Sequence, residues 1–235
     1  LMLANFSASL IIGSAKMIVQ WRWDELVFGK VSFAFSLSSV FMTFITPISI
    51  VLFPSLKRLD QNTLPSLYKS IRSSVSLVLF GVMLFYYPGC WIIEIWLPKY
   101  AQSLLYLGYL LPIIIFSSKV NLLTNNYLKV YRKEKSMMLV NVCSVIAGIA
   151  AFAICAYVFD SLVALILSIV VVIMANSVAS EIRVFKVIGQ RVVKEYIIEA
   201  AMVVVFILSA TLLSRWYGML AYAAAFLIYC GLNFQ

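Results

Sequence analysis

The chain has 235 residues, of which 64% are hydrophobic and 11% are charged, and its formal net charge at pH 7 is +9. Its mean hydropathy is +1.03. Such a small number of polar side chains cannot coat a water-soluble domain, so the composition excludes one and predicts an all-α fold, a polytopic helical bundle integral to a membrane. The chain opens at Leu1 rather than at methionine, and its last apolar run reaches Gln235, so we expect it to be a fragment.

Eight apolar stretches are predicted as transmembrane helices, because roughly 20 helical residues cross the ~30 Å hydrocarbon layer. They cover residues 1–20, 31–56, 73–93, 103–131, 137–159, 162–180, 196–214 and 219–235. Only Asp160 and Ser161 separate the fifth from the sixth, and residues 215–218 separate the last two. Turns this short predict antiparallel neighbours for both pairs.

Basic residues gather in alternate connections between these predicted spans. Three alternate connections hold twelve of the 18 lysines and arginines, and the opposite connections hold four. By the positive-inside rule the three rich connections are cytoplasmic, so the positive charge indicates orientation and attraction to anionic headgroups. We therefore expect no nucleic-acid partner. The rich connections contain Lys57, Arg58, Lys69 and Arg72; Lys129, Arg132, Lys133 and Lys135; and Arg183, Lys186, Arg191 and Lys194.

Two of the rich connections have helical amphipathic patterns. In the first, apolar residues recur at i, i+3, i+4 and i+7 from Leu64 to Ile71, which predicts a helix along the inner membrane surface. In the third, residues 182–194 have one apolar and one basic face. This pattern predicts either a second surface helix or a cytoplasmic extension of the preceding span.

The predicted span 103–131 contains Lys119 near its middle. A charge at this depth costs about 2.5 to 3.5 kcal/mol on insertion scales, so it requires a partner. At helical spacing Lys119 shares a face with Asn126 and Tyr127, with Asn121 and Asn125 nearby. The pattern predicts a polar face toward a protein cavity, or a lysine paired with a carbonyl or an acid of a neighbouring helix.

Signals of catalysis are absent from the sequence. The chain has no histidine, and its four cysteines are scattered without CxxC spacing. A histidine base, a histidine metal ligand and a disulfide framework are therefore excluded, and no Walker-type glycine loop occurs. We expect no enzymatic activity, no cofactor and no metal site, which leaves transport as the main prediction.

Several short sequence patterns follow one another between Asp24 and Ser136, and their order matters more than any one of them. They are Asp24, Glu25 and Gly29; the serine-rich stretch 32–39; Pro47; Pro54 before Lys57 and Arg58; WLPKYAQS at 96–103; and YRKEKS at 131–136. In this order they resemble the second lobe of bacterial polysaccharide (O-antigen) flippases of the Wzx type. These flippases belong to the superfamily that also holds multidrug MATE exporters and the lipid II flippase. The likeness covers residues 1–180 and weakens beyond them.

The resemblance implies two six-helix lobes around a central cavity with alternating access. Residues 1–180 would then form a six-helix lobe, 181–195 a cytoplasmic amphipathic connection, and 196–235 two further helices. The resemblance also implies a bacterial inner-membrane location and export of an oligosaccharide carried on a polyprenyl pyrophosphate lipid, for lipopolysaccharide or another surface polysaccharide. A proton or sodium would be the coupling ion.

This cargo requires cations for its pyrophosphate and hydrogen-bonding groups for its sugars. We expect Lys119 and Lys16 to contact phosphate, although Lys16 could instead snorkel outward. Asparagines 121, 125 and 126 are expected to bind sugar, with plain helix–helix hydrogen bonds as the alternative for each. These candidates are Lys119, Lys16, Asn121, Asn125 and Asn126.

Other classes of function stay open. A MATE-like exporter of cationic small molecules would need an acid at membrane depth, and the nearest candidate is Glu199. We expect Glu199 to pair locally with Lys194 or to face headgroups. A membrane glycan polymerase or ligase would need a large outer loop, which these short connections do not offer, and an assembly subunit also remains open.

Overall fold

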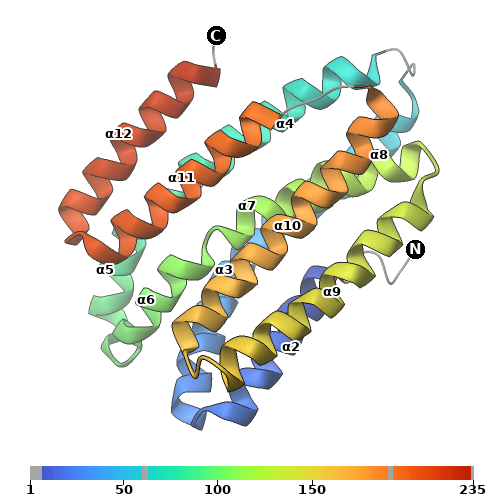
Figure 1. Cartoon of the computed structure of the whole chain (residues 1–235). Coiled ribbons are helices and arrows are strands. Elements are labelled where there is room, and N and C mark those ends of the chain that lie inside the picture. Colours follow the sequence, from blue (N-terminus) through green and yellow to red (C-terminus); the bar gives the residue numbers. More distant parts are fainter. Residues whose placement is uncertain (1–6, 60–62, 190–192, 234–235) are drawn as a thin grey trace.

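The computed structural model describes residues 7–59, 63–189 and 193–233, and within these ranges every regular element is helical. The all-α prediction is therefore confirmed, and Figure 1 shows the helices side by side in a bundle. The elements are α2 Ser7–Arg22, α3 Glu25–Lys57, α4 Leu64–Met83, α5 Tyr86–Trp96, η1 Pro98–Tyr100, α6 Ala101–Leu110, α7 Ile113–Lys119, η2 Val120–Thr124, α8 Asn125–Val130, α9 Glu134–Tyr157, α10 Leu162–Ile188, α11 Val193–Leu212 and α12 Arg215–Asn233.

A broken helix lies at the centre of the bundle and consists of α6, α7, η2 and α8. It bends by 45° between Leu110 and Ile113, where Pro112 removes a backbone donor and disrupts the helical ladder. Its segments contact α3, α4, α10 and α11. The predicted span 103–131 is therefore a bent helix surrounded by other helices, and its middle has no contact with lipid because residues 110–120 are all buried.

The two predicted helical hairpins are present. Helix α9 packs against α10 across the turn at Asp160, and α11 packs against α12 across the turn before Arg215. Asp160 has a φ of 47°, a left-handed conformation that allows the tight reversal. Figure 1 shows both pairs running antiparallel, as their short connections predict.

Four helical stretches are long and apolar enough to cross a membrane, or five if the bent pair Pro98–Leu110 and Ile113–Val130 is one span. They indicate a membrane-embedded protein, but the prediction of eight spans is wrong for the described residues. Helix α2 has 16 residues, fewer than the roughly 20 required, and residues 1–6 of that predicted span lie outside the described ranges. In α3, only the shorter apolar stretch Pro47–Lys57 is found among the described residues. The four stretches are Leu64–Trp96, Glu134–Tyr157, Leu162–Ile188 and Glu195–Leu212.

The predicted surface helix at residues 64–71 is also wrong. These residues form the first two turns of α4, and Leu64 and Tyr68 are each only 1% exposed. Their apolar stripe packs in a cluster with Tyr127, Val184 and other residues, so it faces protein and not headgroups. In the third connection, residues 182–188 continue α10, which is the alternative of an extended span.

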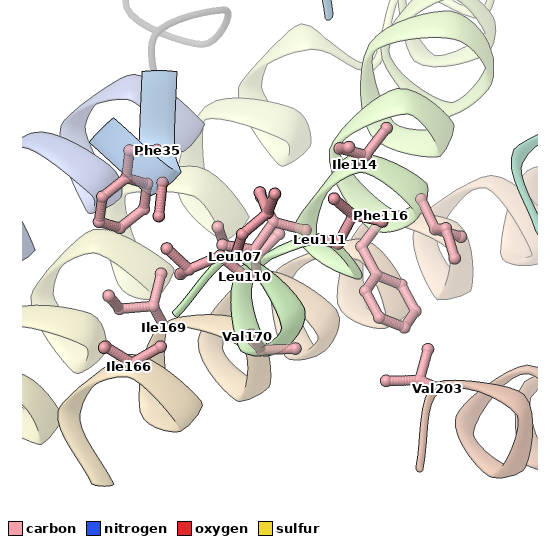
Figure 2. Packing of buried hydrophobic residues seen from close by; sticks show 14 of the residues in the cluster. Phe35, Leu107, Leu110, Leu111, Ile114, Phe116, Ile166, Ile169, Val170 and Val203 are labelled. Atoms are coloured by element: carbon pink, nitrogen blue, oxygen red, sulfur yellow. The ribbon is translucent and has the colours of Figure 1, made fainter. Parts of the chain in front are cut away.

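The apolar core lies where the central broken helix meets α10 and α3. Figure 2 shows Leu107 and Leu110 of α6 beside Ile166, Ile169 and Val170 of α10. Leu110, Ile166 and Ile169 are fully buried. Helix α10 is apolar on nearly all sides here because it has neighbours on several sides, α9, α6 and α7 among them.

The two ends of the bundle differ in charge. At one end the last turn of α3, the first turn of α4, α8 and the last turns of α10 meet in one apolar cluster, and this end carries the basic groups Lys57, Arg58, Arg132, Lys133 and Lys186. At the other end, ion pairs join Arg22 to Asp160 and Arg215 to Glu94. The bundle therefore has one strongly basic end, which we call the basic end.

Candidate functional site

A cavity of about 800 Å³ opens between α2, α3, α9 and the central broken helix. Its volume lies within the range of small-molecule binding sites. Six serines, three asparagines and two lysines line it beside apolar side chains. The lining therefore combines positive charge with hydroxyl and amide groups. The polar lining residues are Ser9, Lys16, Ser36, Ser38, Ser39, Ser49, Ser117, Asn121, Asn125, Asn126, Lys129 and Glu134.

Lys16 supplies positive charge from α2. Its ammonium lies 5.1 Å from the centre of the Phe35 ring, a cation–π contact. Within the described ranges no carboxylate forms an ion pair with Lys16, although the cavity lining includes Glu134. The contact with Phe35 holds the Lys16 side chain against the wall that α3 forms.

The three asparagines lie together on η2 and α8 and all line the cavity, but their amides have different contacts. Asn126 Nδ2 donates to Ser49 Oγ at 3.0 Å, to Ser49 O at 3.1 Å and to Leu122 O at 2.8 Å. Asn125 Nδ2 donates to Asn121 Oδ1 at 3.4 Å, and its own Oδ1 has no partner among the described residues. Asn126 therefore joins α8 to α3, whereas Asn125 keeps an unused acceptor beside the cavity.

A π-helical turn, η2, explains why Lys119 and Asn126 do not share the predicted face. A π turn inserts one extra residue, which rotates the following helix by about 100°. Thr124 Oγ1 donates to Lys119 O at 3.5 Å, and Ser49 Oγ donates to Asn121 O at 2.7 Å. The Thr124 and Ser49 side chains thus donate to backbone carbonyl oxygens that the changed hydrogen-bond pattern of the π turn leaves available. Lys119 consequently faces α11, and Asn126 faces α3.

Lys119 belongs to a buried ion network with Arg72, Glu181 and Glu199, all at most 4% exposed. Lys119 Nζ lies 2.7 Å from Glu199 Oε2 and 3.5 Å from Glu181 Oε1. Arg72 contacts Glu181 at 3.2 Å and Glu199 at 3.1 Å. Two cations therefore alternate with two carboxylates, and the four charges sum to zero.

Neighbouring polar groups complete the ion network. Tyr68 donates to Glu181 at 3.2 Å, and Ser76 donates to Glu199 at 3.0 Å. The ring of Tyr196 lies 5.1 Å from the Arg72 guanidinium. A buried carboxylate oxygen of Glu195, whose side chain is partly exposed as a whole, lies 3.6 Å from Arg72. These contacts connect α4, α7, α10 and α11, so the ion network is a polar cross-link through the apolar bundle.

The structure thus separates the predicted binding residues. Lys16, Asn121, Asn125 and Asn126 line one cavity, whereas Lys119 lies in the ion network and is not among the lining residues. Pairing with acids on neighbouring helices was one of the two expectations for Lys119. Its contact with a substrate stays a prediction, and the ion network gives it a structural role.

The expectation for Glu199 is wrong. It is 2% exposed and pairs with Lys119 and Arg72 instead of facing headgroups. Sequence reasoning also missed Arg72 and Glu181 because it ended the predicted spans at the first charge, at residues 73 and 180. A signal was present in the sequence, because Arg72, Glu181 and Glu199 each lie at the edge of, or within, an apolar stretch. Opposite charges inside a membrane pair with one another, so these residues are candidate partners for one another and for Lys119.

Comparisons with protein-family models, curated proteins and solved structures find no match for the chain.

Proposed function

We propose that the protein transports a lipid-linked oligosaccharide across the bacterial cytoplasmic membrane by alternating access, as its resemblance to Wzx-type polysaccharide flippases implies. The cargo would be a glycan on polyprenyl pyrophosphate, and a proton or sodium would be the coupling ion. The observation that supports this proposal is the cavity, because its lysines suit an anionic group and its serines and asparagines suit sugar hydroxyls.

Lys16 is the cation best suited to the pyrophosphate. It is partly exposed in the cavity, whereas Lys119 is 0% exposed and already has two carboxylate partners. A lysine without an acidic partner can neutralise a phosphate without first breaking an ion pair. Lys129 also lines the cavity, at the basic end of the bundle.

A MATE-like exporter of cations is the second candidate, and the charges of the cavity argue against it. A cationic substrate requires an uncompensated carboxylate at depth. Glu199 is at depth, but Lys119 and Arg72 neutralise it and it does not line the cavity. Glu134 does line the cavity but is exposed at the start of α9.

Surface glycan and membrane abundance, measured together in the natural host with the full-length protein, test the proposal. Lys16→Met should reduce export by about tenfold or more, since a hydrogen bond to a charged group contributes roughly 1.5 to 3 kcal/mol. Lys16→Arg should keep part of the activity because it keeps the charge. Lys99→Met, at an exposed lysine outside the cavity, is the control and should be fully active.

Two results would contradict the proposal. Surface glycan that is unchanged when the whole gene is deleted would exclude glycan export as the function. Full export by Lys16→Met at normal abundance would remove the cavity cation from the mechanism and return Lys16 to a packing role over Phe35.

A further inference from the structure

Three oxygens beside the cavity have no hydrogen-bond partner within the described ranges: Ser38 Oγ, Ser117 Oγ and Asn125 Oδ1. Their residues are 5%, 3% and 3% exposed, and all three line the cavity. A buried polar atom without a partner destabilises the protein, because it has lost its hydrogen bonds to water without replacing them. Three such atoms in the wall of one cavity are groups that a ligand in the cavity would satisfy.

Several other serines and asparagines of the cavity wall already have partners, so these three differ from them. Ser36 and Ser39 donate to carbonyls of their own helix at 2.9 Å and 2.7 Å. Ser49 bonds Asn121 O, and the amide of Asn126 makes three bonds. The buried oxygens without a partner in the described part of the cavity wall therefore lie on α3, α7 and α8, and they belong to neutral side chains.

We propose that Ser38, Ser117 and Asn125, spread along the cavity wall, form a subsite that binds hydroxyl groups of successive sugar units of a neutral glycan and is separate from the lysine that takes the anion. This inference rests on the proposed function. A sugar hydroxyl both donates and accepts, so it can satisfy a serine hydroxyl and an amide oxygen alike. A phosphate only accepts, so it leaves Asn125 Oδ1 without a donor.

The oxygens are shielded beneath the cavity wall, and a small movement brings them to a ligand. Rotation about one side-chain bond moves a serine oxygen between staggered positions. Since neither serine oxygen has a partner among the described residues, this rotation breaks no hydrogen bond there. The two serines can thus turn toward a ligand without a rearrangement of the helices.

Ser117→Ala and Ser38→Ala test the subsite in the purified protein in lipid nanodiscs. Removal of an unpartnered oxygen should leave thermal stability unchanged or slightly raised. Affinity for maltotriose, a neutral glycan probe measured by saturation-transfer NMR, should fall about three- to tenfold in each variant, as expected for one lost hydrogen bond. Affinity for inorganic pyrophosphate should stay the same, and Lys16→Met should lower it.

Ser180→Ala is the matched control, because Ser180 is 1% exposed with an oxygen that has no partner in the described part of the chain, and it does not line the cavity. It should bind maltotriose as the parent protein does. Absence of maltotriose binding to the parent, or equal affinities in Ser117→Ala, Ser38→Ala and Ser180→Ala, overturns the subsite. The export result for Lys16→Met is independent of these measurements, so failure of the subsite is distinguishable from failure of the transport function.

Discussion

Removal of the Lys119 charge should destabilise the bundle through the carboxylates it leaves behind. In Lys119→Met the ion network keeps Arg72, Glu181 and Glu199, so the buried charge becomes −1 in place of zero. Loss of one partner of a buried ion pair costs about 3 to 5 kcal/mol. Both glutamates retain Arg72 as a partner, so we expect about 3 kcal/mol for Lys119→Met and more for Arg72→Met.

A second substitution should restore much of this stability. Glu199→Gln in the Lys119→Met background returns the ion network to neutrality, and the amide that it introduces keeps an oxygen for the Ser76 hydroxyl. A neutral replacement of a buried pair is often tolerated, so the double variant should lie within about 1 kcal/mol of the parent protein. The free energy of unfolding by detergent titration in micelles measures both effects.

Lys69→Met provides the control on the same helix as Arg72, because Lys69 is exposed and its loss should change stability by less than about 0.5 kcal/mol. A Lys119→Met protein as stable as the parent would refute the electrostatic reasoning. Additive effects of Lys119→Met and Glu199→Gln would refute it as well, because groups in direct contact must couple.

Two further predictions concern the helix packing and the orientation of the bundle. Asn126→Leu should cost about 2 to 3 kcal/mol in unfolding free energy, because it removes the bonds to Ser49 and Leu122; a neutral effect would show that α8 and α3 need no polar contact. Single cysteines at Ser136, near the basic end, and at Gln102, at the opposite end, should react with an impermeant thiol reagent from opposite sides of the membrane, Ser136 from the cytoplasm. Labelling of both from one side would contradict the orientation.

The apolar pattern predicted where the helices lie, because burial in lipid and burial in protein both require apolar residues. The short connections predicted at residues 160–161 and 215–218 gave the correct neighbours, because a short connection leaves the following helix no other place to pack. In the structure the second turn lies just before Arg215, where α12 begins. The pattern predicted more spans than the described residues contain: α2 is only 16 residues long there, and α3 contributes only the stretch Pro47–Lys57.

Prediction of the site was limited by the assumption of a regular helix. The π turn at Val120–Thr124 has no strong composition signal, yet it separates Lys119 from Asn126. Lys16, Asn121, Asn125 and Asn126 were recognised as polar groups in apolar surroundings, and they do line one cavity. The acidic partners of Lys119 lie 62 and 80 positions away along the chain, and no local pattern connects residues so distant.

The ion network also sets an order for assembly of the chain. The α9–α10 and α11–α12 hairpins join sequence neighbours, which can meet soon after synthesis. Arg72 and Glu199, in contrast, are 127 residues apart. Until α11 arrives, two cations share Glu181, and the nascent bundle holds an excess positive charge inside the membrane. Synthesis of α11 therefore neutralises this charge in addition to completing the helix packing. A chain that stops before Glu199 should be recognised and degraded by membrane proteases.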